Sequence, residues 1–131
     1  MKFDWRYFAK EDYEKIRVRN PESKKELDYL GSVWVGDIAI DLVNRYYGDG
    51  KNHLDYDLYV GHEDTGYGYK SIPYDYADGG GFYITEDISY EEFKVIAEKE
   101  FEEFIKVNSN GKWESGLSLL DHANKPLEIW Y

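Results

Sequence analysis

Hydrophobic and polar residues alternate along the middle of the chain, in two runs separated by turn-forming residues. In the first run, residues 33–47, apolar side chains hold odd positions before Gly36 and even positions after it. One extra residue in a β-bulge at this glycine would produce the change of parity. In the second run, residues 53–61, apolar side chains hold the even positions. Such alternation is typical of strands with one buried face, so we predict a β-hairpin that pairs 33–47 with 53–61.

The register of this hairpin is limited by the requirement that both apolar faces coincide. Paired residue numbers must then sum to an even value, because a slip of one residue turns every side chain to the other face. The register that pairs Leu42 with Leu58 meets this requirement. It also places Arg45 opposite Asp55, which is a favourable cross-strand pair. It leaves the segment 48–52, Gly-Asp-Gly-Lys-Asn, as the connecting loop, and this composition is typical of turns.

A helix is predicted over residues 89–106. Ser89 and Glu92 have the spacing of a capping box, in which a serine and a glutamate satisfy the first free amides of a helix. The apolar residues that follow recur at helical spacing. They are Phe93, Ile96, Ala97, Phe101, Phe104 and Ile105.

The remaining segments have weaker patterns. We predict a strand near residues 3–7, a helical turn within 10–18 and a short helix over 21–30. The segment 61–82 is predicted to be a long loop that contains a short strand near 67–72, and two C-terminal strands are predicted over 113–120 and 127–130. The elements together predict an α+β fold, an antiparallel sheet packed by one long amphipathic helix. The length of 131 residues favours a single domain, 1–131.

Charge is spread unevenly along the chain. The net charge is −11, and residues 31–131 hold twenty of the 27 acidic residues but only eight of the 16 basic ones. An acidic surface repels phosphate backbones, so we expect no direct binding to nucleic acid. It attracts basic partners and accelerates their encounter. Acidity also keeps proteins soluble, so charge alone leaves both interpretations open.

Several other classes are disfavoured by composition. The chain has no cysteine, which excludes disulfides, cysteine-ligated zinc and a thiol nucleophile. The first ten residues are charged and lack the apolar core of a signal peptide. No apolar run approaches the length of a membrane span. We therefore expect a cytoplasmic protein without membrane contact.

Catalytic and metal-binding signatures are weak. His53, Asp55 and Asp57 share one face of a predicted strand, with His62 and Glu63 nearby. Their spacing matches no calcium loop or zinc motif, so we predict no metal site. The glycine run 79–81 is not followed by the lysine of a phosphate-binding loop, and we interpret it as a turn. We assign no catalytic residue and no cofactor.

A protein-binding surface is the better-supported site. The segment 61–82 holds four tyrosines among glycines, a serine and acids. Tyrosine supplies large contact area at low entropic cost, and glycine and serine let a loop adapt to its partner. The neighbouring hairpin adds aspartates and a fifth tyrosine. The predicted partner-binding residues are Asp37, Asp41, Asp57, Tyr59, Tyr67, Tyr69, Tyr74, Asp75, Tyr76 and Asp78.

The sequence therefore favours a small acidic, tyrosine-rich protein that masks a basic surface on another protein. Such a protein could be an inhibitor or immunity protein, or a phage- or plasmid-borne anti-defence protein whose carboxylates imitate DNA. Residues of one strand face are roughly 6.6–6.8 Å apart, about twice the phosphate spacing of one DNA strand. Two alternatives remain: a small enzyme or metal-binding protein with a His/Asp/Tyr site in 61–82, and a structural subunit.

Overall fold

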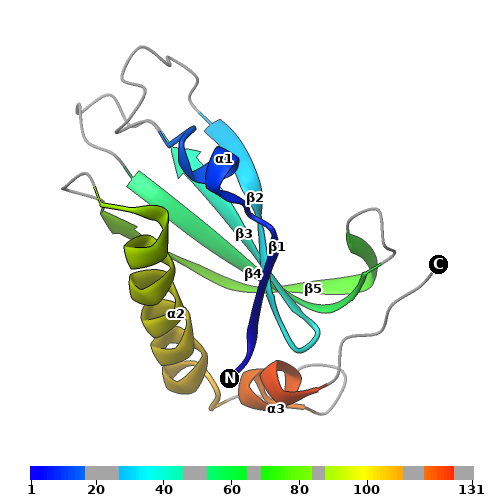
Figure 1. Ribbon diagram of the computed structural model, residues 1–131. Coiled ribbons are helices and arrows are strands. Elements are labelled where there is room, and N and C mark those ends of the chain that lie inside the picture. The colour runs from blue at the N-terminus through cyan, green and yellow to red at the C-terminus, as the bar shows by residue number, and fades with distance from the viewer. Residues whose placement is uncertain (17–26, 46–52, 65–68, 84–87, 111–116, 126–131) are drawn as a thin grey trace.

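The computed structural model describes residues 1–16, 27–45, 53–64, 69–83, 88–110 and 117–125 (Figure 1). At residues 27–28, 45, 53, 61–64, 69–79 and 82–83 the description is of the backbone alone. The elements are, in chain order, β1 (Phe3–Tyr7), α1 (Lys10–Tyr13), β2 (Leu27–Val35), β3 (Ile38–Arg45), β4 (His53–Asp64), β5 (Tyr69–Tyr83), α2 (Tyr90–Val107) and α3 (Leu119–Asn124). The fold is α+β, as the sequence predicts.

The described strands form one antiparallel sheet in the order β1-β2-β3-β4-β5, so neighbours in the chain are neighbours in the sheet. The long helix α2 lies along one side of this sheet (Figure 1). Its buried side chains and most of the buried apolar side chains of the strands belong to one hydrophobic core, which also receives Phe8, Tyr13 and Leu119. The predicted antiparallel sheet with one long packed helix is therefore confirmed.

The predicted bulge at Gly36 is wrong, because the chain reverses there. Residues 33–47 are not one strand: β2 ends at Val35, β3 begins at Ile38, and these two residues pair. An odd-numbered residue of β2 thus pairs with an even-numbered residue of β3, which explains the change of parity. A bulge and a two-residue turn change the parity equally, so the alternation could not distinguish them.

The hairpin of β3 and β4 is confirmed, with a register that differs by two residues. Leu42 pairs with Tyr56, not Leu58, and Arg45 pairs with His53, not Asp55. Paired numbers still sum to an even value, so the apolar faces coincide as expected. A slip of two residues preserves both faces, and the hydrophobic pattern therefore cannot exclude it.

The predicted loop over 61–82 is largely strand. β4 continues to Asp64, and β5 begins at Tyr69 and pairs with β4 as far as Tyr83. The glycine run 79–81 lies within β5 rather than in a turn. A Cβ atom on Gly80 would lie 2.5 Å from the hydroxyl of Tyr56, so glycine is needed there for close packing and not for a turn.

The helix α2 agrees closely with its prediction. Its N-cap is Ser89, whose Oγ accepts a hydrogen bond of 3.1 Å from the amide of Glu92. Most of the predicted apolar stripe is buried, but Phe104 is only partly buried against the core and Ile96 is 49% exposed. The buried members recur every four residues and face the sheet. They are Phe93, Ala97, Phe101 and Ile105.

The weaker predictions have mixed outcomes. The strand at 3–7 is confirmed by β1, and the helical turn within 10–18 by α1. The helix over 21–30 is wrong for its described part, since residues 27–30 belong to β2. Of the predicted strand 113–120, Leu119 and Leu120 are helical instead. Residues 113–116 and 127–130 lie outside the described part of the chain.

A local signal explains the helix in place of that strand. Ser118 and Asp121 form a capping box: Ser118 Oγ accepts from the Asp121 amide, and the Asp121 carboxylate accepts from the Ser118 amide. Reciprocal capping satisfies two helix-start donors and begins α3 at Leu119. Among the described helices, none is long and apolar enough to cross a membrane.

The central strand β3 is buried on both faces over residues 38–44, and β2 is buried on both faces over residues 32–35. Ile38, Ile40 and Leu42 of β3 enter the core, while Ala39 and Val43, which alternate with them, are buried outside it. Trp34 of β2 is likewise only 1% exposed and outside the core cluster. At these positions of β2 and β3, the second face of the sheet is therefore also buried.

Candidate functional site

The predicted partner-binding residues do not share one environment. Asp57 and Tyr59 are half-buried on β4, on the face that alternates with the core residues. Most of the others lie along β5, where the backbone pairing is described: Tyr69, Tyr74, Asp75, Tyr76 and Asp78. Tyr67 lies outside the described residues.

The pairing of β4 with β5 brings several of these residues to adjacent positions. Tyr59 is the register partner of Tyr76, and Val60 is the partner of Asp75. Asp78 pairs with Leu58, one residue from Asp57. Residues that are up to about twenty positions apart in the sequence are thus neighbours in the sheet, on a strand pair rather than a loop.

Asp41 is buried, with 9% of its surface exposed. Its Oδ1 accepts a hydrogen bond of 2.7 Å from the hydroxyl of Ser32, which lies 2.6 Å from the hydroxyl of Tyr29. Since the single proton of Ser32 points to the carboxylate, the Tyr29 hydroxyl donates to Ser32. Asp41 therefore has an internal role, although in register it lies directly beside Asp57.

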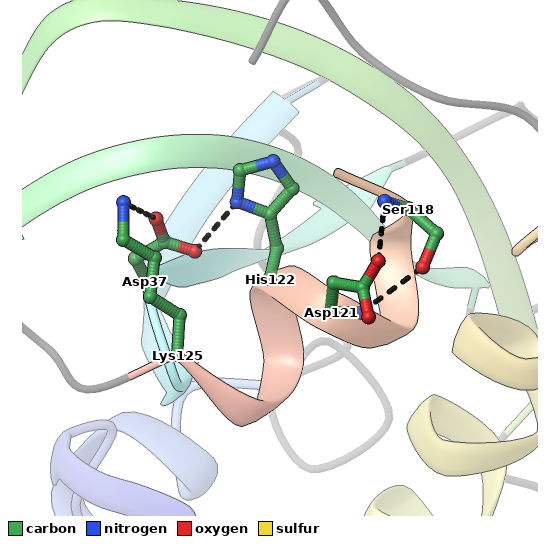
Figure 2. Close-up of polar contacts among 5 residues, drawn as sticks. All are labelled: Asp37, Ser118, Asp121, His122 and Lys125. Atoms are coloured by element: carbon green, nitrogen blue, oxygen red, sulfur yellow. Dashed lines mark hydrogen bonds and ion pairs between the residues drawn. The ribbon is translucent and has the colours of Figure 1, made fainter. Parts of the chain in front are cut away.

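Asp37 is also buried, at 4% exposed, in the turn between β2 and β3 (Figure 2). One carboxylate oxygen lies 2.9 Å from Nδ1 of His122, and the other lies 3.5 Å from Nζ of Lys125. The Asp37 amide also donates to the main-chain oxygen of His122 at 3.2 Å. This aspartate therefore fastens α3 to the sheet and contributes no exposed charge.

Gly36 makes the close approach of α3 possible. Its φ angle of 57° lies in the left-handed region, which side chains other than glycine rarely adopt. A Cβ atom at this position would collide with the main-chain oxygen of His122 and lie 2.5 Å from that of Ala123. The turn and the end of α3 thus fit together as backbone against backbone.

A pocket of about 500 Å³ opens beside this junction. Its walls come from β1, from the β2–β3 hairpin and from the end of α3. They are formed by Lys2, Phe3, Asp4, Trp5, Trp34, Gly36, Ala123, Asn124 and Lys125. The volume is in the range of small-molecule sites, and three of the nine residues are aromatic.

One residue of the pocket wall has a signal in the sequence. Trp34 stands at a position that the alternation assigns to the polar face of its strand, which indicates a second buried region. The contact of Asp37 with His122 had no such sign, because it joins residues 85 positions apart. His122 lies within α3.

Among the described residues, no group of three or more histidine, aspartate or glutamate side chains could hold a metal ion. The side chains of His53 and His62 lie outside the described part of the structure. Comparison with protein-family models, with curated proteins and with solved structures gives no match.

Proposed function

We propose that the protein acts by binding a basic site on another protein through an acidic, tyrosine-containing surface formed by β4 and β5. The observation that carries this proposal is the position of Asp55, Asp57 and Tyr59. They occupy alternate positions of β4, are half-buried rather than enclosed, and face away from α2. We call these three residues together with β5 the β4–β5 surface.

The strand beside this row favours an open surface. Gly81 and Gly79 are the register partners of Asp55 and Asp57, and glycine has no side chain to cover a neighbour. A Cβ atom at Gly81 would lie 2.6 Å from Oδ1 of Asp55, so the carboxylate extends over the strand. A half-buried carboxylate beside glycine backbone would be within reach of a long lysine or arginine side chain of a partner.

The net charge of −11 supports the same proposal. A strongly acidic protein attracts a basic partner over a distance of about 8–10 Å at physiological salt, and this accelerates association. Tyr59 and Tyr76 are register partners on β4 and β5. Tyrosine is enriched among the residues that contribute most of the binding energy of protein–protein interfaces.

Two biological roles would use this surface. An inhibitor or immunity protein would cover the basic active site of a nuclease or toxin. A phage- or plasmid-borne anti-defence protein would occupy a DNA-binding groove as a mimic of DNA. Asp55 and Asp57 are two residues apart on one strand, a spacing of roughly 6.6–6.8 Å. The identity of the captured partner distinguishes the two roles.

The test is capture from a lysate of the host cell with tagged protein at low and high salt. The decisive variant is Asp55→Asn/Asp57→Asn. Its matched control is Glu11→Gln/Glu103→Gln, which removes the same charge at exposed positions of α1 and α2. We expect the wild type and the control to capture a basic protein that high salt releases, and the decisive variant to lose it. Equal capture by all three proteins would show that the β4–β5 surface is not the binding site.

A further inference from the structure

The pocket beside α3 differs in chemistry from the rest of this acidic protein. Three aromatic side chains form much of its wall, Phe3 and Trp5 from β1 and Trp34 from β2. Trp34 is almost fully buried, whereas Phe3 and Trp5 are half-buried. Aromatic rings at the edge of a cavity offer faces and edges to a planar ligand.

Among the described residues of the wall, the charged groups are two lysines and one aspartate. The aspartate, Asp4, is occupied by Arg6: its Oδ1 accepts from the Arg6 amide at 3.0 Å, and its Oδ2 accepts from the guanidinium at 2.7 Å. Burial raises the pKa of Asp4, but the hydrogen bonds and charge of Arg6 and the charge of Lys2 outweigh it, and its pKa lies below the ordinary value. Arg6 therefore balances the negative charge of the Asp4 carboxylate at the pocket.

The two lysines of the wall come from opposite ends of the described chain. Lys2 precedes β1, and Lys125 follows α3. Lys125 contacts the buried Asp37 at 3.5 Å, yet 46% of its side chain remains exposed. Asp37 thus holds an ammonium group at the pocket wall and leaves it accessible to solvent.

The junction beside the pocket is held by buried contacts. His122 and Asp37 form a buried contact, and Gly36 packs against the end of α3. Trp5 is fixed as well, because its Nε1 donates a hydrogen bond of 2.8 Å to Glu98 of α2. A cavity with fixed walls loses little entropy when it binds a ligand.

We propose that this pocket binds a small organic anion with a planar aromatic body. The aromatic wall would receive the ring system, and Lys2 and Lys125 would contact the acidic group. The pocket is distinct from the row of Asp55, Asp57 and Tyr59, since none of the described side chains of β4 or β5 contributes to its wall. This inference therefore stands or fails independently of the proposed partner.

Isothermal titration calorimetry with 2-naphthalenesulfonate tests the proposal. Naphthalene and 2-naphthylmethylammonium serve as the neutral and cationic counterparts of the same ring system. We expect saturable binding of the sulfonate at one site, and binding of the other two at least about tenfold weaker. The indole N–H signals of Trp5 and Trp34 should shift in the NMR spectrum as the sulfonate is added.

Variants assign the binding to this pocket. Lys125→Gln and Lys2→Gln should each weaken sulfonate binding about five- to tenfold, the effect of losing one charge contact near a surface. Lys99→Gln removes an exposed lysine of α2 outside the pocket wall and should change the affinity by less than about twofold. Asn124→Trp fills the pocket without changing charge and should abolish binding.

Three results would overturn the proposal. They are the absence of saturable binding at millimolar sulfonate, equal binding of the ammonium compound, and an effect of Lys99→Gln equal to that of Lys125→Gln. Thermal melting of each variant shows whether it is folded. Lys2→Gln keeps the test decisive if loss of the Lys125 contact with Asp37 lowers stability.

Discussion

The Nδ1 atom of His122 lies 2.9 Å from a carboxylate oxygen of Asp37, and both side chains are buried (Figure 2). The contact joins α3 to the turn between β2 and β3. A buried carboxylate that loses its partner keeps the full cost of its desolvation. The junction is therefore a sensitive point in the fold.

Replacement of His122 should reveal this sensitivity. We expect His122→Ala to lower the free energy of unfolding by about 3 kcal/mol, since the buried carboxylate of Asp37 would lose its closest partner. Lys125→Gln should cost less than about 1 kcal/mol, because Lys125 is half-exposed. Urea denaturation of both variants measures the difference. Equal effects would show that the imidazole contributes no more than the exposed lysine.

The turn itself gives a second prediction. Gly36→Ala should lower the free energy of unfolding by more than about 2 kcal/mol, because the left-handed backbone alone costs roughly 1–2 kcal/mol for a residue with a Cβ atom. The added methyl group would also collide with main-chain oxygen atoms of α3. Asn124→Ala, at an exposed position of α3, should stay within about 0.5 kcal/mol of the wild type. A near-neutral Gly36→Ala variant would contradict the observed junction.

Tyr56 and Gly80 should be energetically coupled across β4 and β5. The Tyr56 ring packs over Gly80 and donates a hydrogen bond of 2.9 Å to Glu100 of α2. Tyr56→Phe should cost about 1 kcal/mol through loss of this bond. Gly80→Ala should cost about 1–3 kcal/mol through overpacking.

A double-mutant cycle measures the coupling directly. In a Tyr56→Leu background the hydroxyl and ring edge that oppose residue 80 are absent, so Gly80→Ala should become cheaper by at least about 0.5 kcal/mol. Simple additivity of the two changes would mean that the glycine is required for some other reason.

Tyr90 should make stability depend on alkaline pH. Burial raises the pKa of Tyr90 above the ordinary value of 10.0, and the charges of Glu91, Asp12 and Glu11 raise it further. The protonated hydroxyl donates a hydrogen bond of 2.5 Å to the main-chain oxygen of Phe8. Because the folded-state pKa exceeds the unfolded one, this contribution is complete below pH 10 and is lost as the pH rises through the folded-state pKa.

Unfolding measured between pH 8 and pH 12 tests the Tyr90 prediction, with Tyr90→Phe as the control. We expect the stability of the wild type to fall more steeply above pH 10 than that of Tyr90→Phe. NMR titration of labelled tyrosines should show Tyr90 ionising at higher pH than an ordinary tyrosine. Parallel curves for the two proteins would contradict the prediction.

The sequence alone determined the elements whose signals are local. The capping residue Ser89 and the spacing of Phe93, Ala97 and Phe101 define α2, because a helix satisfies its own backbone and exposes one face in a fixed period. The alternation in β3 and β4 likewise predicted which residues face the core. It failed at Gly36, where a turn and a bulge leave the same pattern.

Only the tertiary structure decided what depends on contacts between distant residues. From the sequence, Gly80 is predicted to lie in a turn. In the structure it lies in a strand, and the ring of Tyr56 packs over it. From the sequence, Asp37 and Asp41 are predicted to be surface charges. In the structure they are buried, and they contact His122 and Ser32. Residues from the whole chain decide whether a side chain is buried. The sequence therefore does not distinguish an aspartate on the surface from one in the interior. The α+β fold was therefore predictable from the sequence. The pocket and the internal roles of Asp37 and Asp41 were not.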